Sequence, residues 1–252
     1  MLDRVPGGRS TDRRGDLVVL DDGTSARFVS AVVPLVPHVE RHLRPGVVAN
    51  RVVSTANGVI RLEPWRTARA RLRRELRALG ERAESLLVAD VRACYPSIRP
   101  EVVARCLRAL GCSRRHASGL ERVLEAIERS GVRGLPVGPD PSAVLANAVL
   151  AAADEALVRA GAIHLRWVDD FFVFAQRRGE GRRALAVLEA TLEQLGLELA
   201  PHKTRLLEGR TEIARGLGRR GVSPIGHGYD RADDAHAVPR IPRPHALVSA
   251  DG

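Results

Sequence analysis

The sequence contains few aromatic residues, no long apolar run and only three cysteines. Aromatic residues make up 3% of the chain, so a core drawn from its 44% hydrophobic residues must consist mainly of Leu, Val and Ala. No stretch approaches the roughly 18 apolar residues of a membrane span, and the polar N-terminus does not resemble a secretory signal. The odd number of cysteines and the lack of a CxxC spacing argue against a disulfide framework and against a zinc site. We therefore expect a soluble, cytoplasmic protein with no membrane partner.

Basic residues outnumber acidic ones, and nearly all of the basic residues are arginine. The formal net charge of +10 and the pI near 11 favour a polyanionic partner, and nucleic acid is the first candidate. The chain has 39 arginines and one lysine, a bias typical of genomic codon usage, so no single arginine can be assigned to a contact from its presence alone. Lys203 stands out against this bias, because it is the one position that keeps an ammonium group.

The apolar patterns indicate a mixture of helices and strands. They predict helices at 66–82, 100–110, 119–130, 142–158 and 182–195, and strands at 85–91, 164–175 and 197–207. A tight turn at Asp169 and Asp170 implies an antiparallel hairpin. Because helices and strands do not alternate strictly, we predict an α+β fold with helices on one face of an antiparallel sheet. The arginine-rich helix at 66–82 fits either a phosphate-contacting helix or a solvated amphipathic helix.

Asp169 and Asp170 lie in an apolar, aromatic segment that should form strands. Trp167 and Phe171 flank them. An unpaired carboxylate is costly to bury, so the pair needs a partner such as a metal ion. A hairpin turn can also carry adjacent aspartates, and both explanations stay open for the pair alone. The Asp pairs at 21–22 and 233–234 sit among polar residues, as expected for solvated turns.

A third carboxylate, Asp90, ends the predicted strand at 85–91. If that strand lies beside the hairpin of Asp169 and Asp170, three carboxylates converge at one edge of the sheet. Oxygen ligands of this kind suit Mg²⁺ or Mn²⁺. A pair of such ions can activate an attacking hydroxyl and stabilise the leaving oxygen in a phosphoryl transfer. Lys203 is then the candidate that protonates a leaving pyrophosphate, because an arginine cannot give up its proton. The alternative is an ordinary surface lysine.

Four motifs occur in the order and spacing of a known enzyme family. They are DVRACYPSI at 90–98, GLPVG at 134–138 followed by Ser142 and Asn147, WVDDF at 167–171, and LGLELAPHKT at 195–204. Together they resemble motifs A, B, C and D of reverse transcriptases, especially the bacterial retron-like, group II intron-like and phage-defence lineages. The segment 33–51 also resembles the fingers of such enzymes. The resemblance implies an RNA-directed DNA polymerase that uses an RNA template, deoxynucleoside triphosphates and two Mg²⁺ or Mn²⁺ ions to make a DNA product.

The resemblance implies catalytic and metal-binding roles for five residues. Asp90 and Asp169 would bridge the metal ions, and Asp170 would be an accessory ligand. The backbone carbonyl of Val91 would be a further ligand. Lys203 would take the catalytic place of the motif D lysine.

The resemblance also implies nucleotide-binding positions. Tyr95 matches the aromatic gate that excludes a ribose 2′-hydroxyl, and its alternative is a core aromatic residue. The loop at 134–138, with Gly138 at its end, would let the backbone approach nucleotide and template, and Ser142 would start the helix that follows. An ordinary turn with a Ser cap is the alternative. Asn147 would either contact the nucleotide pocket or satisfy backbone groups.

Two positions and the C-terminal region depart from the family pattern. Val137 replaces the Gln of many members, which removes a side-chain contact, and Trp167 replaces the usual Tyr. The region after the last motif is rich in Pro and Gly, and a helical thumb does not fit there. We therefore expect a flexible N-terminal tail at 1–16, a reduced fingers-like region at 17–84, a palm catalytic domain at 85–215 and an irregular C-terminal tail at 216–252. A second protein subunit, a homo-oligomer or a structured noncoding RNA would then supply the grip on the duplex.

Three functional hypotheses are consistent with these features. The leading one is a reverse transcriptase in a bacterial antiphage defence or retroelement system. The second is a non-catalytic or partner-dependent polymerase-like subunit that binds nucleic acid. The third, prompted by Val137 and the missing thumb, is template-independent or protein-primed DNA synthesis.

Overall fold

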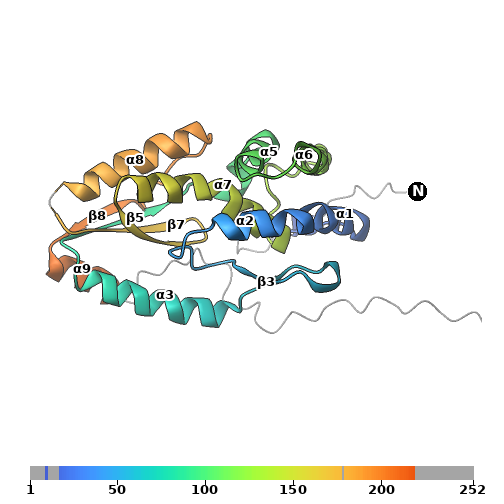
Figure 1. Ribbon diagram of the computed structural model, residues 1–252. Coiled ribbons are helices and arrows are strands. Elements are labelled where there is room, and N and C mark those ends of the chain that lie inside the picture. The colour runs from blue at the N-terminus through green and yellow to red at the C-terminus, as the bar shows by residue number, and fades with distance from the viewer. Residues whose placement is uncertain (1–8, 11–16, 178, 219–252) are drawn as a thin grey trace, which may run out of the picture.

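A four-stranded antiparallel sheet forms the centre of the molecule (Figure 1). The computed structural model describes residues 9–10, 17–177 and 179–218. The strands lie in the order β6 (Ile163–Trp167), β7 (Asp170–Ala175), β5 (Ser85–Asp90) and β8 (Arg205–Glu208). Each strand runs antiparallel to its neighbours. The predicted α+β fold with an antiparallel sheet backed by helices is confirmed.

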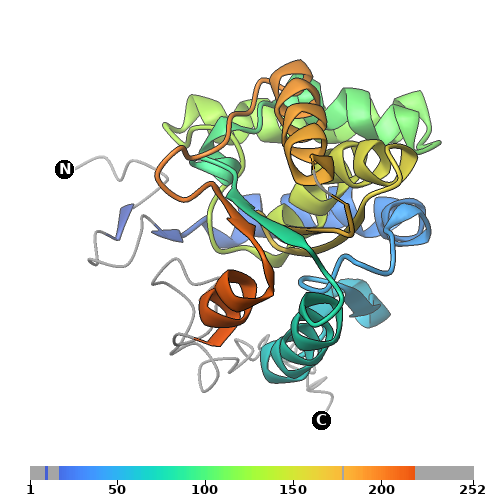
Figure 2. The ribbon, with the colours of Figure 1, turned by 90° about the vertical axis from the view of Figure 1, so that its left-hand side faces the viewer.

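Helices cover both faces of this sheet rather than one. Figures 1 and 2 show α7 (Asp140–Arg159) and α8 (Glu180–Gln194) on one face, and α3 (Trp65–Gly80) and α9 (Arg210–Gly218) on the other. Strand β5 explains why, because all six of its residues are buried. A run that is apolar at successive positions buries side chains on both sides of the sheet, whereas an alternating run buries one side. The prediction of helices on a single face was therefore wrong.

The two faces belong to two separate apolar clusters. Leu87 and Ala89 join the larger cluster, which contains many of the apolar residues of α7 and α8. Leu86 and Val88 join the smaller one, which includes Leu72 and other residues of α3 together with one residue of α9. The alternation along β5 thus divides its side chains between the two cores.

Further helices gather beyond one end of the sheet, where Figure 1 shows α1, α5 and α6. Among these elements, α1 packs against α6 and α7, and α5 packs against α6 and α7. The helices are α1 (Asp22–Val32), η1 (Val33–Leu35), α2 (Val36–His42), α4 (Cys94–Ser97), α5 (Pro100–Ala109) and α6 (Arg114–Arg129). The small elements are β1 (Arg9–Ser10), β2 (Leu17–Val18), β3 (Val52–Ser54), η2 (Ala56–Gly58) and β4 (Arg61–Leu62).

Three predicted element boundaries need correction. Helix α6 begins at Arg114, before the predicted residue 119, because the side chain of Ser113 accepts a hydrogen bond from the backbone N–H of His116 and caps it. Helix α7 begins at Asp140, so Ser142 does not start it. Strand β8 covers only the end of the predicted strand region at 197–207, and Lys203 lies in the turn before it.

The predicted tails lie mostly outside the described residues. In the predicted N-terminal tail, Arg9–Ser10 form β1, which pairs with β2. At the other end, α9 continues to Gly218, past residue 216, where the irregular C-terminal tail was predicted to begin. Of the described helices, α7 is long and apolar enough to cross a membrane, but 78% of its most apolar segment is buried inside the protein. Its apolar surface is therefore covered by the core of the fold.

Candidate active site

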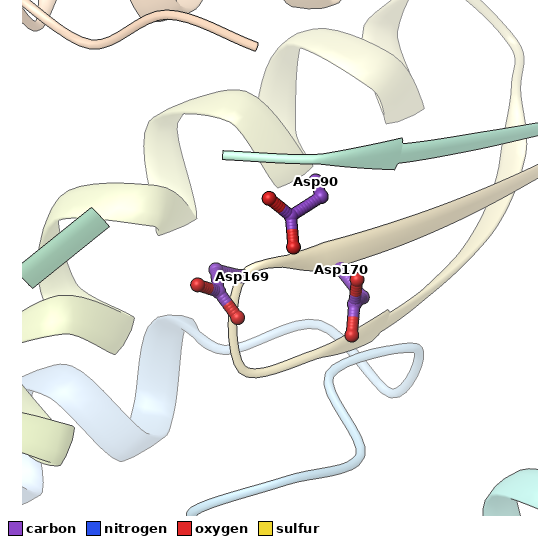
Figure 3. A group of neighbouring side chains, drawn as sticks. All are labelled: Asp90, Asp169 and Asp170. Carbon is purple, nitrogen blue, oxygen red and sulfur yellow. The ribbon is translucent and has the colours of Figure 1, made fainter. Parts of the chain in front are cut away.

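Three aspartates from two neighbouring strands meet at one end of the sheet. Asp90 is the last residue of β5 and Asp170 is the first residue of β7, and the two are direct partners across the antiparallel pair. Asp169 precedes Asp170 in the turn from β6. Carboxylate oxygens of the three residues lie within 4.8 Å of one another, and Figure 3 shows the side chains around a common space. The predicted convergence of the three carboxylates is confirmed.

The turn that carries Asp169 has an unusual backbone conformation. Trp167 pairs with Asp170, so Val168 and Asp169 form a two-residue hairpin turn. Val168 has a φ of 56°, which is a sterically unfavourable value for a β-branched residue. Such strain persists only where the surroundings hold the backbone in place, and it is concentrated at functional sites. One such support comes from the backbone N–H of Val91, which donates to the carbonyl of Asp169 at 3.2 Å.

Burial and mutual repulsion disfavour the ionised forms of Asp169 and Asp170. Burial, and next the charge of Asp90, raise the pKa of Asp169 from 3.8 to about 6. Burial, and next the charges of Asp169 and Asp90, raise the pKa of Asp170 further, from 3.8 to about 8. Like charges at this separation cannot all ionise without compensation. The site therefore has a deficit of positive charge.

Lys203 supplies one positive charge to this cluster. Its Nζ donates a hydrogen bond of 2.9 Å to Oδ2 of Asp90, and this hydrogen bond is the main cause that raises the pKa of Lys203 above its usual value. The side chain is about half exposed, so solvent can also reach it. Lys203 thus stays protonated while one side of its ammonium group faces the carboxylates.

The backbone before Lys203 explains how the lysine reaches Asp90. The segment 198–200 runs antiparallel to 90–92, with an isolated bridge between Val91 and Leu199. The N–H of Ala200 donates to the carbonyl of Asp90 at 2.8 Å, and the N–H of Lys203 donates to the carbonyl of Ala200. A turn at this point, rather than the predicted strand, brings the side chain back toward the cluster.

The cluster has the composition of a divalent cation site. Among the described residues it offers three carboxylate groups and no His or Cys ligand, and Mg²⁺ and Mn²⁺ prefer such oxygen donors. The raised pKa values of Asp169 and Asp170 show that one lysine does not balance the negative charge. Asp90, Asp169 and Asp170 therefore fit a divalent metal, and the carbonyl of buried Val91 adjoins them in sequence.

The glycine-rich loop at 134–138 packs beside Tyr95. The N–H of Leu135 donates to the carbonyl of Tyr95 at 2.9 Å. Gly134 has a φ of 64°, and a Cβ at this position would lie 2.6 Å from the carbonyl oxygen of Pro96. Only glycine fits so close an approach with a positive φ. Tyr95 itself is 9% exposed and belongs to the larger apolar cluster, so its proposed contact with a nucleotide sugar stays a prediction.

The other end of the loop contacts an N-terminal segment that we did not expect there. The N–H of Val18 donates to the carbonyl of Val137 at 2.8 Å. Gly138 has a φ of 119°, and a Cβ added to it would lie 3.3 Å from the side chain of Leu17. Residues 17 and 18 therefore form part of the surroundings of this loop.

Ser142 and Asn147 are buried in α7. Ser142 is fully buried, so a direct contact with a nucleotide stays a prediction. Asn147 is 2% exposed and donates from Nδ2 to the carbonyls of Ala49 and Asn50, at 3.4 and 3.1 Å. The sequence left open whether Asn147 contacts the nucleotide pocket or satisfies backbone groups, and these hydrogen bonds show the second role.

A buried polar network beside the hairpin turn of Val168 and Asp169 was missed by the sequence analysis. Arg166 of β6 is fully buried and forms an ion pair with Asp154 of α7, and His164 hydrogen-bonds to the same carboxylate. The signal was present in the sequence, because an arginine interrupts the apolar strand and an aspartate interrupts the apolar helix at 142–158. Two opposite charges in two buried segments indicate a buried ion pair.

A family model confirms what the motifs indicate. The model described as reverse transcriptase (RNA-dependent DNA polymerase) matches residues 32–225, which is well over half of the chain. No curated protein matches the chain.

Proposed function

The chain belongs to the reverse transcriptase family, and we propose that it is an RNA-directed DNA polymerase that acts through two Mg²⁺ or Mn²⁺ ions. The family match supports a polymerase function of the reverse transcriptase type. The observation that carries the proposal further is the meeting of Asp90, Asp169 and Asp170 within 4.8 Å, beside the one lysine of the chain. A binding subunit without catalytic activity needs neither the carboxylates nor the lysine.

In this proposal Asp90, Asp169 and Asp170 hold the metal ions, together with the carbonyl of Val91. When bound, the two ions lower the barrier for attack of a primer 3′-hydroxyl on the α-phosphorus and stabilise the leaving oxygen. The new oxygen–phosphorus bond forms as the bond to pyrophosphate breaks. The carboxylates must be ionised to serve as ligands, so the raised pKa values of Asp169 and Asp170 make metal binding release protons.

Lys203 is proposed as the proton donor to the leaving pyrophosphate. Its ammonium group is oriented by Asp90 and open to solvent on another side. A lysine can both hold a proton at neutral pH and transfer it, whereas an arginine holds it too tightly. Tyr95 is proposed as the gate that selects deoxynucleotides. The hydrogen bond from the N–H of Leu135 to its carbonyl supports this role, because it places Tyr95 beside the glycine-rich loop at 134–138.

Substitution of the aspartate pair tests the proposed chemistry. Asp169→Asn combined with Asp170→Asn should abolish incorporation of labelled deoxynucleotide on a primed RNA template, because the amides are poor ligands for Mg²⁺. Asp22→Asn is the matched control, since Asp22 belongs to an exposed Asp pair at the start of α1. If the doubly substituted protein still extends the primer, the assignment of the active site is wrong.

The template, partners, location and pathway are further parts of the proposal. We propose a cytoplasmic enzyme of an antiphage defence or retroelement system, supported by the resemblance to those bacterial lineages. A second subunit, a further copy of the chain or a structured noncoding RNA would complete the grip on the duplex. Isolation of the protein from its host, followed by sequencing of the bound nucleic acid, tests the template. Product that remains attached to denatured protein would instead indicate protein-primed synthesis.

A further inference from the structure

Arg166 is a fully buried charge three residues before the aspartate pair. Its Nε and Nη2 atoms donate to both carboxylate oxygens of Asp154, at distances of 2.7 to 3.1 Å. Burying a guanidinium is unfavourable unless its charge is paired and its donors are satisfied. The pair with Asp154 balances the charge and satisfies the Nε and Nη2 donors, but apolar residues in place of both Arg166 and Asp154 would have no charge to balance. The ion pair alone therefore does not explain why a charge lies at this position.

The remaining contacts of the guanidinium explain its position better. Nη1 of Arg166 donates to the backbone carbonyl of Val168 at 2.8 Å. Val168 is the residue of the hairpin turn with the unfavourable φ of 56°, and Asp169 is the next residue. A peptide group with a strained conformation relaxes unless its surroundings hold it. The bond from Arg166 holds the carbonyl of Val168, and the bond from the N–H of Val91 holds the carbonyl of the next residue, Asp169.

The same arginine also links the turn to two other parts of the fold. Its Nη1 donates to Oδ1 of Asn147 in α7 at 2.8 Å. Its backbone N–H donates to the carbonyl of Gly46, and its carbonyl accepts from Val48. Gly46 allows this approach, since a Cβ there would lie 2.3 Å from the carbonyl oxygen of His164. Arg166 therefore joins the turn to a core helix and to the segment that follows α2.

We infer that Arg166 is a positioning residue that fixes the turn of Val168 and Asp169 so that the carboxylate of Asp169 faces Asp90 and Asp170. Asp154 and Asn147 in turn fix the guanidinium. The inference rests on the proposed function, because it assigns Arg166 an effect on the metal affinity of the three aspartates. Groups that orient metal ligands without touching the metal typically change its affinity by about 10- to 100-fold when they are substituted.

The test compares Arg166→Lys with His164→Leu. Lysine keeps the positive charge but loses the planar fork, so it cannot bind Asp154, Asn147 and the Val168 carbonyl together. His164→Leu is the matched control, because His164 is also buried in β6 and bonds to Asp154 at 3.0 Å, but among the described contacts its side chain makes no hydrogen bond to the turn. The affinity for Mn²⁺ is measured by electron paramagnetic resonance of the free ion, and the melting temperature is measured in parallel without metal.

We expect both substitutions to lower the melting temperature and only Arg166→Lys to weaken Mn²⁺ binding, by about 10- to 100-fold. If Arg166→Lys does not fold, Arg166→Met combined with Asp154→Leu replaces both buried charges by apolar groups and still leaves the Val168 carbonyl without its donor. Unchanged Mn²⁺ affinity in the Arg166 variant that folds would overturn the inference. The inference would also be overturned if neither of the two Arg166 variants folds, or if His164→Leu loses as much Mn²⁺ affinity as the Arg166 variant does. In either case Arg166 would act through the stability of the fold. A wild-type protein that binds no Mn²⁺ would instead contradict the proposed function.

Discussion

The metal-free protein should lose stability as the pH rises, because its folded state holds protons on Asp169 and Asp170 that its unfolded state releases. The pKa of Asp170 is 3.8 in an unperturbed chain and about 8 in the folded protein, and that of Asp169 rises to about 6. Between these values the unfolded state binds fewer protons than the folded state, so the free energy of unfolding falls with increasing pH. The loss should be complete once the pH exceeds the folded pKa of Asp170.

The size of the effect follows from the pKa of Asp170. Each pH unit between the unfolded and folded values contributes about 1.4 kcal/mol. Between about pH 5 and pH 8, ionisation of Asp170 should therefore remove about 4 kcal/mol from the free energy of unfolding, and Asp169 should remove about 1 kcal/mol more. A bound divalent cation stabilises the ionised carboxylates, so saturating Mg²⁺ should restore most of the loss at the higher pH.

Urea denaturation in EDTA and in Mg²⁺, at about pH 5 and about pH 8, measures these differences. Asp170→Asn should lose most of the pH dependence, because its amide does not ionise, and it should gain less from Mg²⁺. Asp22→Asn, at an exposed position, should behave as the wild type does. A wild-type protein whose free energy of unfolding stays level across this range in EDTA would refute the reasoning.

Three further predictions each test a single feature of the site, two of them with a control substitution. Lys203→Arg should lower deoxynucleotide incorporation by about 100-fold or more with little change in melting temperature, because arginine keeps the charge but not the proton transfer; equal rates in a steady-state assay would contradict this. Gly134→Ala should lower the free energy of unfolding by about 3 kcal/mol, since its Cβ would meet the carbonyl of Pro96 at 2.6 Å. Gly111→Ala, with a φ of 80° and open space around it, should cost only about 1 kcal/mol, and equal losses on urea denaturation would remove the steric argument. Tyr95→Ala should let ribonucleotides compete with deoxynucleotides, whereas Tyr95→Phe should not; a competition assay in which both variants still discriminate would exclude Tyr95 as the gate.

The parts of the fold that were predictable are those with strong local patterns. Strand β5 is a short apolar run that ends in a carboxylate, and α3 has an apolar stripe at Leu72 and Leu76, so both were located within a few residues. The carboxylate cluster was predictable as well, because strand ends are visible in the sequence and place Asp90, Asp169 and Asp170 at one end of the sheet. These predictions needed only the residue pattern and the pairing of neighbouring strands.

Two of the features that escaped prediction depend on contacts between distant segments. The turn at Lys203 is specified by hydrogen bonds between 198–200 and the backbone around Asp90, which no local pattern reveals. The positive φ of Val168 contradicts the intrinsic preference of valine, and the Arg166 guanidinium that bonds to its carbonyl is itself held by Asp154 and Asn147 of a distant helix. The start of α6 was missed because its first turn is polar and its signal is the cap at Ser113 rather than an apolar repeat.

The contact between Val18 and Val137 has a practical consequence for work with fragments. The family match begins at residue 32, yet Phe28 is buried and α1 packs against α6 and α7. A fragment cut at the first matched residue would open an apolar surface on those helices and would leave the Val137 carbonyl facing solvent. Because the packed core extends upstream of the region that the family model matches, expression, crystallisation and activity trials should use fragments that begin no later than residue 17.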